Sequence, residues 1–369
     1  MSLRNKRKIK VLHIGEYVKG GVATYLKTIL GIDNELIDEY LVLSNEKSIH
    51  EWDLPNDKIH YYEYQRGLSG VVFAIKTIIK LVNTINPDII YCHSTWAGVI
   101  GRVPFLWKRT NAKIIYNAHG WAFLMDVSNL KRKIYSFIER LLLLVTDCVV
   151  NVSKYEYTAA VNYGLDAKKM MVLYSGTDYP KEFEKERNVY SDDEETVKIL
   201  FVGRFDPQKG VDYLLNCFQR YSFDNVHLYL IGGSVVSAYE YEKNNTSKIT
   251  FLGWVPNEKI DEYYSSCDVV IMPSRWEAFG LVAIEAMKYS KPIIASNRGA
   301  LPELIHDNYN GYIFDLDNEE SLKNILEGLS KKKLKLLGEN AYKEYTLYYT
   351  ADIMRERVKK LYFNVLDMT

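Results

Sequence analysis

The sequence predicts an α/β protein built from two doubly wound domains in tandem. Short β-branched and aromatic runs alternate with longer amphipathic segments throughout the chain, which is typical of parallel sheets covered by helices. Each half also begins with a strand that runs into glycine, in "VLHIGEYVKGGVATYL" and in "ILFVGRFDPQKGVDYLL". With 369 residues, the chain is long enough for two domains that each bury a core.

The predicted strands follow in order along both halves. In the first half they are "KIKVLHIG", "DIIYCHS", "KIIYNAH" and "DCVVNVS", and in the second half "VKILFVG", "VHLYLIG", "DVVIMPS" and "KPIIAS". Residues 179–198 are polar and acidic without an apolar period, so we expect a linker between a first domain, 1–178, and a second, 199–350. Residues 351–369 carry apolar side chains at helical spacing and predict a packed C-terminal helix.

Composition narrows the classes of function. The formal net charge is zero, and residues 1–150 hold 20 Lys and Arg against 14 Asp and Glu. This asymmetry is compatible with an acceptor at an anionic membrane, or with chance, and is too small to indicate nucleic-acid binding. The four cysteines have no metal-binding spacing, which favours buried reduced thiols in a cytoplasmic protein.

No signal peptide or membrane-spanning segment is expected, because no apolar run reaches about 18 residues. The nearest approach is residues 130–150, "LKRKIYSFIERLLLLVTDCVV". A helix followed by a buried strand explains this segment better than a helix that lies on a membrane.

The loop "GRFDPQKG" follows a predicted strand and enters a helix at about Gly210. Arg204 and Lys209 could therefore both face an anion at that strand end, unless they are ordinary surface cations. Neither glycine loop of the chain is a Walker sequence or G-x-G-x-x-G, which disfavours an NTPase and a nicotinamide enzyme.

Two glutamates stand in the otherwise apolar run "PSRWEAFGLVAIEAM", residues 273–287. Glu277 and Glu285 are poorly placed for one face of one helix, since eight residues turn the chain by roughly 800°. We expect Glu277 to end a loop and Glu285 to lie on a helix that begins near Gly280. Such a helix N-terminus attracts phosphate; the alternative is a solvated helix with two surface acids.

In combination, these segments closely resemble the retaining glycosyltransferases of family 4, which have the GT-B fold. The resemblance extends over the whole chain, in "KGGVATYL", "NAHGWAF", "TDCVVNVS", "VLYSGTD", "LFVGRFDPQKG", "FLGWVP", "EAFGLVAIEAM" and "LPELIHDNYNGYIF". It implies two Rossmann-like domains facing a cleft, with the C-terminal helix packing back towards the first domain. The pieces "GGVATY" and "HGWAF" look most like enzymes that assemble bacterial capsule, exopolysaccharide or O-antigen on lipid-linked acceptors at the cytoplasmic membrane face.

The resemblance also implies roles for individual residues. Arg204 and Lys209 would hold the donor diphosphate in place of a metal ion, Glu285 would bind the ribose hydroxyls, and Glu277 those of the transferred sugar. The family's functionally important histidine corresponds to His119. Backbone would approach the donor at Gly20 and Gly21 in the first domain, and at Phe279, Gly280, Leu281 and Val282 in the second. No metal or other cofactor is expected. The expected partners are a nucleotide-sugar donor (UDP- or GDP-sugar) and a glycan or lipid-linked acceptor, with peripheral contact to the inner membrane face. No nucleic-acid partner is expected.

Several departures and alternatives remain. The family's "GxGP" is replaced by "IGGSV" at 231–235, Ala278 stands where the family often has Gly or Pro, and Ser175 precedes Gly176 where Asn-Gly is common. A sucrose-forming or glycolipid-forming transferase, a nucleotide-sugar 2-epimerase and an inactive nucleotide-sugar-binding scaffold are the competing functions.

Overall fold

The computed structural model describes residues 7–16, 18, 20–44, 52–63, 68–180, 189–190, 195–234 and 245–367. Several sequence predictions fall partly outside this description. They concern residues 1–6 of the basic start, Lys19 of the first glycine loop, 181–188 and 191–194 of the expected linker, and Val235 of "IGGSV".

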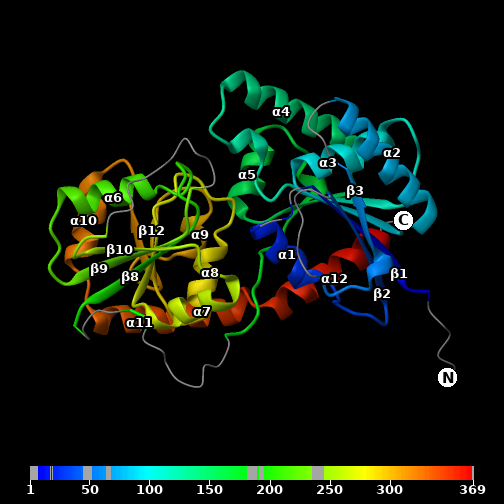
Figure 1. Ribbon diagram of the computed structural model, residues 1–369. Helices are drawn as coiled ribbons and strands as arrows, with labels where there is room; N and C mark the ends of the chain where they lie inside the picture. The colour runs from blue at the N-terminus through cyan, green and yellow to red at the C-terminus, as the bar shows by residue number, and fades with distance from the viewer. Residues whose placement is uncertain are drawn as a thin grey trace. The chain divides into compact units, whose positions relative to one another are not determined.

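The chain forms two compact units (Figure 1). Unit 1 comprises residues 1–176 and 351–369, and unit 2 comprises residues 177–350. Within the expected linker, Tyr190 is buried in unit 2, where its ring lies 4.3 Å from that of Tyr229.

Unit 1 is built on a seven-stranded parallel sheet in the order β3-β2-β1-β4-β5-β6-β7. Its strands are β1 (Ile9–Gly15), β2 (Ile37–Ser44), β3 (Ile59–Tyr62), β4 (Ile89–His93), β5 (Lys113–Asn117), β6 (Cys148–Asn151) and β7 (Met170–Val172). Its α-helices are α1 (Gly21–Ile29), α2 (Leu68–Ile85), α3 (Thr95–Arg102), α4 (Asn129–Leu142), α5 (Lys154–Asn162) and α12 (Ala351–Asp367).

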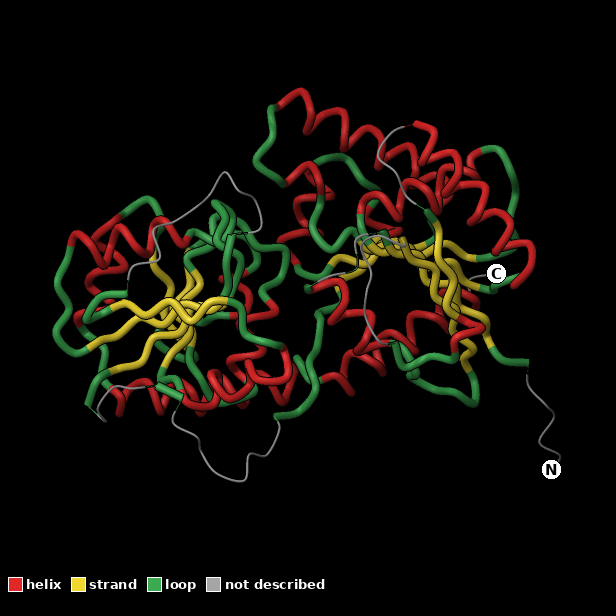
Figure 2. Tube along the Cα trace, in the orientation of Figure 1, coloured by secondary structure: helices red, strands yellow, loops and turns green. Residues whose placement is uncertain are grey.

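Helices cover both faces of this sheet (Figure 2). Successive strand residues point to opposite faces, so Leu12 of β1 packs in one core cluster with Ile78 of α2, whereas Val11 packs in another with residues of α1 and α12. The C-terminal helix lies beside α1, as predicted, and is anchored there by hydrogen bonds from Arg355 to the Thr28 carbonyl at 2.9 Å and from Lys359 to Asp33 at 2.8 Å (Figure 1).

Unit 2 is built on a six-stranded parallel sheet in the order β10-β9-β8-β11-β12-β13. Its strands are β8 (Val197–Val202), β9 (Val226–Ile231), β10 (Ile249–Gly253), β11 (Val269–Met272), β12 (Ile293–Ser296) and β13 (Gly311–Phe314). Its α-helices are α6 (Val211–Arg220), α7 (Asn257–Ser266), α8 (Leu281–Met287), α9 (Leu301–Leu304), α10 (Glu319–Glu327) and α11 (Lys331–Tyr348).

The predicted α/β class and all eight predicted strands are confirmed. In both units the strand order reverses beside the first strand, between β1 and β4 in unit 1 and between β8 and β11 in unit 2. Ligands of doubly wound sheets bind outside the carboxyl ends of the strands at such a reversal point. The loops that follow these four strands are therefore the first places to search for a site.

Candidate active site

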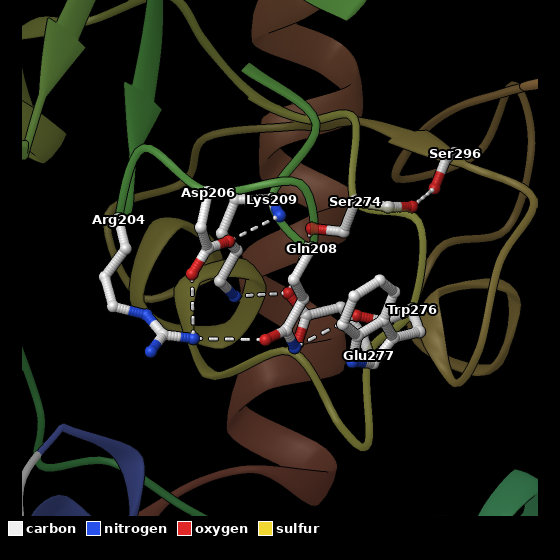
Figure 3. A network of polar contacts seen from close by, with 8 residues as sticks. All are labelled: Arg204, Asp206, Gln208, Lys209, Ser274, Trp276, Glu277 and Ser296. Carbon is white, nitrogen blue, oxygen red and sulfur yellow. Dashed lines mark hydrogen bonds and ion pairs between the residues drawn. The ribbon is translucent and has the colours of Figure 1, made fainter. Parts of the chain in front are cut away.

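The two loops at the reversal point of unit 2 are fastened to each other. Gly203–Gly210 follows β8, and Pro273–Gly280 follows β11. The Arg275 amide donates to the Gln208 carbonyl at 2.8 Å, and the Gln208 side-chain amide donates to the Trp276 carbonyl at 3.2 Å (Figure 3). These bonds join segments about 70 residues apart in sequence. The two loops therefore form a single unit over the strand ends, which we call the platform.

At the centre of this platform, Lys209 forms an ion pair with Glu277 (Figure 3). The same oxygen, Glu277 Oε1, accepts a hydrogen bond from the Ser274 hydroxyl at 3.0 Å. Glu277 is only 8% exposed, and these two partners satisfy a carboxylate oxygen that has little access to water. The sequence placed both residues at the site but did not predict that they pair.

Arg204 lies on the same loop as Lys209. Its guanidinium is 3.1 Å from the Asp206 carboxylate and donates to the Gln208 side-chain oxygen at 3.1 Å, with the side chain about half exposed. The other oxygen of Asp206 accepts from the Lys209 amide at 3.1 Å. Asp206 and Gln208 were missed, although aspartate is a common turn residue because its side chain accepts hydrogen bonds from nearby backbone amides.

Two glycines allow the backbone segments of the platform to pack closely. Gly210 has φ +68°, and a Cβ there would lie 2.0 Å from the Pro273 carbonyl oxygen. Gly299 has φ +60°, and a Cβ there would lie 2.3 Å from the Glu277 carbonyl oxygen, which accepts from the Ala300 amide at 3.0 Å. Only glycine combines this backbone conformation with such close approach. The loop that carries Glu277 is thus closely packed at Pro273 and at Glu277 itself.

A second ion pair joins the loop after β11 to α6. Arg275 donates to both carboxylate oxygens of Asp212, at 2.7 and 2.6 Å, and to the Pro207 carbonyl at 2.8 Å. Burial alone would raise the pKa of Asp212, but the Arg275 guanidinium outweighs it and holds that pKa below its usual value. A bidentate pair of this kind fixes orientation as well as charge.

Glu285 lies on α8, which begins immediately after Gly280, as predicted. Its Oε2 accepts a hydrogen bond from the buried Tyr264 hydroxyl at 2.9 Å. Burial raises the pKa of Glu285 above its usual value, opposed by this hydrogen bond and by the positive charges of Lys288 and Lys209. The charge of Lys209 therefore reaches both glutamates. Phe279 is buried, with its ring 6.0 Å from that of Tyr349, so only its backbone could meet a ligand, and Leu281 and Val282 are half-buried.

The predicted "IGGSV" segment supports the platform with backbone groups. The Phe205 amide donates to the Gly233 carbonyl, and the Gly203 amide to the Ile231 carbonyl, both at 3.0 Å. These bonds tie the end of β9 to the loop that carries Arg204, which is a structural role for the segment.

In unit 1, Gly20 and Gly21 begin α1, and His119 follows β5. Tyr25 of α1 connects them, since its ring meets that of His119 edge-on with centroids 4.6 Å apart. His119 has φ +52°, a left-handed conformation stabilised by its amide donating to the Asn117 side chain at 2.9 Å. Burial lowers the pKa of His119 to about 3, so its imidazole is neutral at physiological pH.

His119 is the end of a row of imidazoles that was missed. Its Nε2 is 3.2 Å from Nδ1 of His93, and Nε2 of His93 is 3.1 Å from Nδ1 of His13. His13 Nε2 lies 3.4 Å from the buried Glu39 carboxylate. The sequence held part of the signal, because three predicted strands, now β1, β4 and β5, carry a histidine near, at or just beyond their carboxyl ends. That these strands are neighbours in the sheet became known only from the structure.

Known proteins match this chain over both units. Residues 20–179 match the model of glycosyltransferase family 4, and residues 182–344 match that of the glycosyl transferases group 1. The "Uncharacterized 41.2 kDa protein in cps region" of Klebsiella pneumoniae is 36% identical over 327 residues, which cover 86% of this chain and 89% of that protein. The chain belongs to glycosyltransferase family 4.

More distant family relatives and solved structures cover similar lengths. The UDP-Gal:alpha-D-GlcNAc-diphosphoundecaprenol alpha-1,3-galactosyltransferase of Escherichia coli is 22% identical over 310 residues, 79% of both chains. The sucrose-phosphate synthase of Thermosynechococcus elongatus superposes with a TM-score of 0.79 at 19% identity, covering 98% of this chain and all of that one. The HepE protein of Anabaena, in complex with UDP and glucose, superposes with a TM-score of 0.77 at 19% identity, over 96% and 99% of the chains. These likenesses confirm the predicted GT-B fold.

Proposed function

We propose that this family 4 glycosyltransferase moves a sugar, with retention of anomeric configuration, from a UDP- or GDP-sugar to a glycan or lipid-linked acceptor in bacterial surface polysaccharide assembly. The observation that carries the proposal is the cluster of Arg204, Lys209 and Glu277 on one rigid platform at the reversal point of the unit 2 sheet. Two cations and a carboxylate held this closely suit a ligand that has both a diphosphate and hydroxyl groups.

Each residue has a proposed task. Arg204 and Lys209 bind the diphosphate, Glu277 accepts hydrogen bonds from hydroxyls of the transferred sugar, and Glu285 accepts them from the ribose. Gly280, Leu281 and Val282 bring backbone close to the donor. In unit 1, Gly20 and Gly21 let backbone approach the phosphates, and His119 lies beside the sugar as a neutral imidazole.

The proposed reaction forms a bond between the acceptor oxygen and the anomeric carbon while the bond from that carbon to the β-phosphate oxygen breaks. Both events occur on one face of the sugar, and the acceptor proton passes to the leaving phosphate. Negative charge grows on the diphosphate as it departs, and fixed cations stabilise charge as it develops. The proposal therefore gives Arg204 and Lys209 the part that a divalent ion plays in other transferases, and expects no metal requirement.

The donor and acceptor classes draw on relatives. The Anabaena structure contains UDP and glucose, the name of the Escherichia coli relative specifies a UDP-sugar and a diphosphoundecaprenol-linked acceptor, and the Klebsiella relative is encoded in a cps region. We place the protein in the cytoplasm, where nucleotide sugars are available, at the inner face of the membrane. Within the described residues, no helix combines the length and apolarity needed to cross a bilayer.

A donor panel tests the proposal. Purified protein is heated with UDP-, GDP- and dTDP-sugars, and products formed with membrane lipid extract are identified by mass spectrometry. We expect thermal stabilisation by donors of one base and transfer that persists in EDTA. Strict dependence on added divalent metal would overturn the diphosphate role of Arg204 and Lys209. Binding of several donors without hydrolysis or transfer would favour the inactive scaffold.

A further inference from the structure

The helix α4 presents its apolar side chains to solvent. Five large apolar residues of this helix each have between 38% and 69% of their surface exposed: Leu130, Ile134, Phe137, Ile138 and Leu141. The residues that α4 buries include the polar Ser136 and Glu139. This is the reverse of the usual surface helix, which turns its apolar stripe towards the core.

A buried ion pair holds α4 in this orientation. Arg102 of α3 is fully buried and donates to Glu139 at 2.7 Å, and the Tyr116 hydroxyl donates to the other carboxylate oxygen at 3.1 Å. The Arg102 guanidinium also stacks 3.6 Å above the Tyr116 ring. Separating such a buried pair is costly, so the helix is fixed with Glu139 inward and the opposite face outward.

The exposed apolar residues form one stripe. At 100° per residue they fall within an arc of roughly 100°, centred opposite the midpoint between the buried Ser136 and Glu139. The stripe continues beyond the helix, because the 3₁₀ turn that follows α4, Leu143–Val145, packs against the turn Val103–Leu106. Leu144 in the first turn is 72% exposed, and Trp107, directly after the second, is 81% exposed.

The exposed charges of α4 itself have one sign. The exposed ionisable residues of α4 are Lys131, Lys133 and Arg140, whereas its acid, Glu139, is buried and paired. On the helical wheel Lys131 borders one side of the stripe, and Lys133 and Arg140 border the other. Lys108 and Arg109, both exposed, follow Trp107. The nearest exposed acids along the chain are Asp126, before α4, and Asp147, three residues after Leu144, whose carboxylate lies 3.4 Å from the Lys113 ammonium group.

We propose that this surface, the α4 stripe with Leu144 and Trp107, docks on the surface of an anionic lipid bilayer. A helix with an apolar face flanked by cations lies in the membrane interface, with its apolar side chains among the acyl chains and its cations at the headgroups. Tryptophan and long cationic side chains suit that boundary, where one part of a side chain is apolar and the other wet. A second copy of the chain fits less well, because a twofold interface would bring like charges together.

This docking is independent of which donor is used, but it would bring a lipid-linked acceptor to the enzyme and in that respect extends the proposed function. The test therefore measures membrane binding apart from catalysis. Vesicles of phosphatidylcholine with and without 30% phosphatidylglycerol are mixed with the full chain and separated by flotation. We expect the protein to float with the anionic vesicles and binding to weaken as salt is raised.

Three variants locate the surface. Phe137→Ser with Leu141→Ser should reduce the vesicle partition coefficient at least tenfold, since two large apolar side chains no longer enter the interface. Lys131→Gln with Lys133→Gln and Arg140→Gln should remove the preference for anionic vesicles. Leu336→Ser with Leu347→Ser is the matched control, because both leucines are exposed to a similar extent on α11 in unit 2, and it should bind as the wild type does.

All these side chains are exposed, so the variants should keep the wild-type melting temperature and its stabilisation by donor nucleotide. Loss of membrane binding with retained nucleotide binding supports the docking surface. Unchanged flotation of the α4 apolar variant, or equal binding to neutral and anionic vesicles, overturns it. A concentration-dependent dimer that the same variant abolishes would assign the stripe to a second copy instead.

Discussion

The Lys209–Glu277 ion pair allows the structural and catalytic roles of Lys209 to be separated. We consider Lys209→Met, which keeps most of the apolar stem and removes the ammonium group. In the absence of ligand, the change leaves the Glu277 carboxylate with Ser274 as its remaining hydrogen-bond donor among the contacts described above. Breaking a fully buried pair from one side costs about 3–5 kcal/mol.

The pair here is less than fully buried, since the Lys209 and Glu277 side chains are 20% and 9% exposed. Water can reach the stranded carboxylate, and the Ser274 bond remains, so we expect the free energy of unfolding to fall by about 1–3 kcal/mol. For a unit of this size the melting temperature then falls by roughly 3–9 °C. Differential scanning calorimetry of the wild type and variant measures it.

The double variant, Lys209→Met with Glu277→Gln, distinguishes the two roles. It no longer buries an unpaired charge, so most of the lost stability should return, with a coupling energy of about 1–2 kcal/mol. Turnover should stay well below that of the Glu277→Gln single variant, because Lys209 is proposed to stabilise charge on the departing diphosphate, and removing such a group costs about 10²–10³ in kcat. Recovery of turnover to that level in the double variant would show that Lys209 acts only through Glu277. A single variant that melts like the wild type would show that the pair is no more than a surface contact.

Two further predictions concern protonation and the histidine row. Because burial raises the pKa of Glu285, the unfolded chain ionises this group first as pH rises, so its contribution to stability is present at low pH and is lost as pH rises from the ordinary carboxyl value to the raised one. Binding of the ribose hydroxyls should depend on pH in the opposite way, so the KM for the donor should rise as pH falls through the raised pKa. Glu285→Gln should abolish this acid-side rise in KM. If the rise persists in the variant, it belongs to another group. His93→Phe removes the imidazole that contacts His119. It should lower kcat about ten- to a hundredfold, because the His119 imidazole is misplaced, while the affinity for nucleoside diphosphate stays within twofold of the wild type. Equal losses of kcat and of nucleotide affinity would point to general damage to unit 1.

The family resemblance assigned Arg204, Lys209 and Glu277 to one site, and the sheet explains why they meet. Loops that follow neighbouring parallel strands lie at the same edge of a sheet, and β8 and β11 are neighbours. The contacts within the site depend on register and on backbone detail. Pairing of Lys209 with Glu277 requires the Gly210 and Gly299 backbones to approach within distances that admit no Cβ, and no local pattern in the sequence encodes those approaches.

Residues 130–150 show that the orientation of a helix is harder to predict than its presence. The expected helix and buried strand are confirmed as α4 and β6, and the proposed docking of α4 takes up the membrane-lying alternative that the sequence disfavoured. Periodicity shows that a helix has an apolar side but not which way that side faces. In α4 the direction is decided by Arg102, 37 residues from Glu139 in sequence, and a buried arginine in α3 could not be distinguished from a surface one by spacing. The same lack of long-range information hid the contact between His93 and His119.

The pairing of Lys209 with Glu277 also bears on how a donor would be recognised. One oxygen of the buried Glu277 carboxylate is shared between Lys209 and Ser274. Under the proposed function, an arriving diphosphate draws the ammonium group towards itself and leaves Glu277 short of a donor. A sugar hydroxyl can supply that donor, whereas a bare nucleoside diphosphate cannot. Phosphate binding and sugar binding would then reinforce each other through a single lysine, so that the penalty of a half-satisfied buried carboxylate falls on any ligand that lacks the sugar.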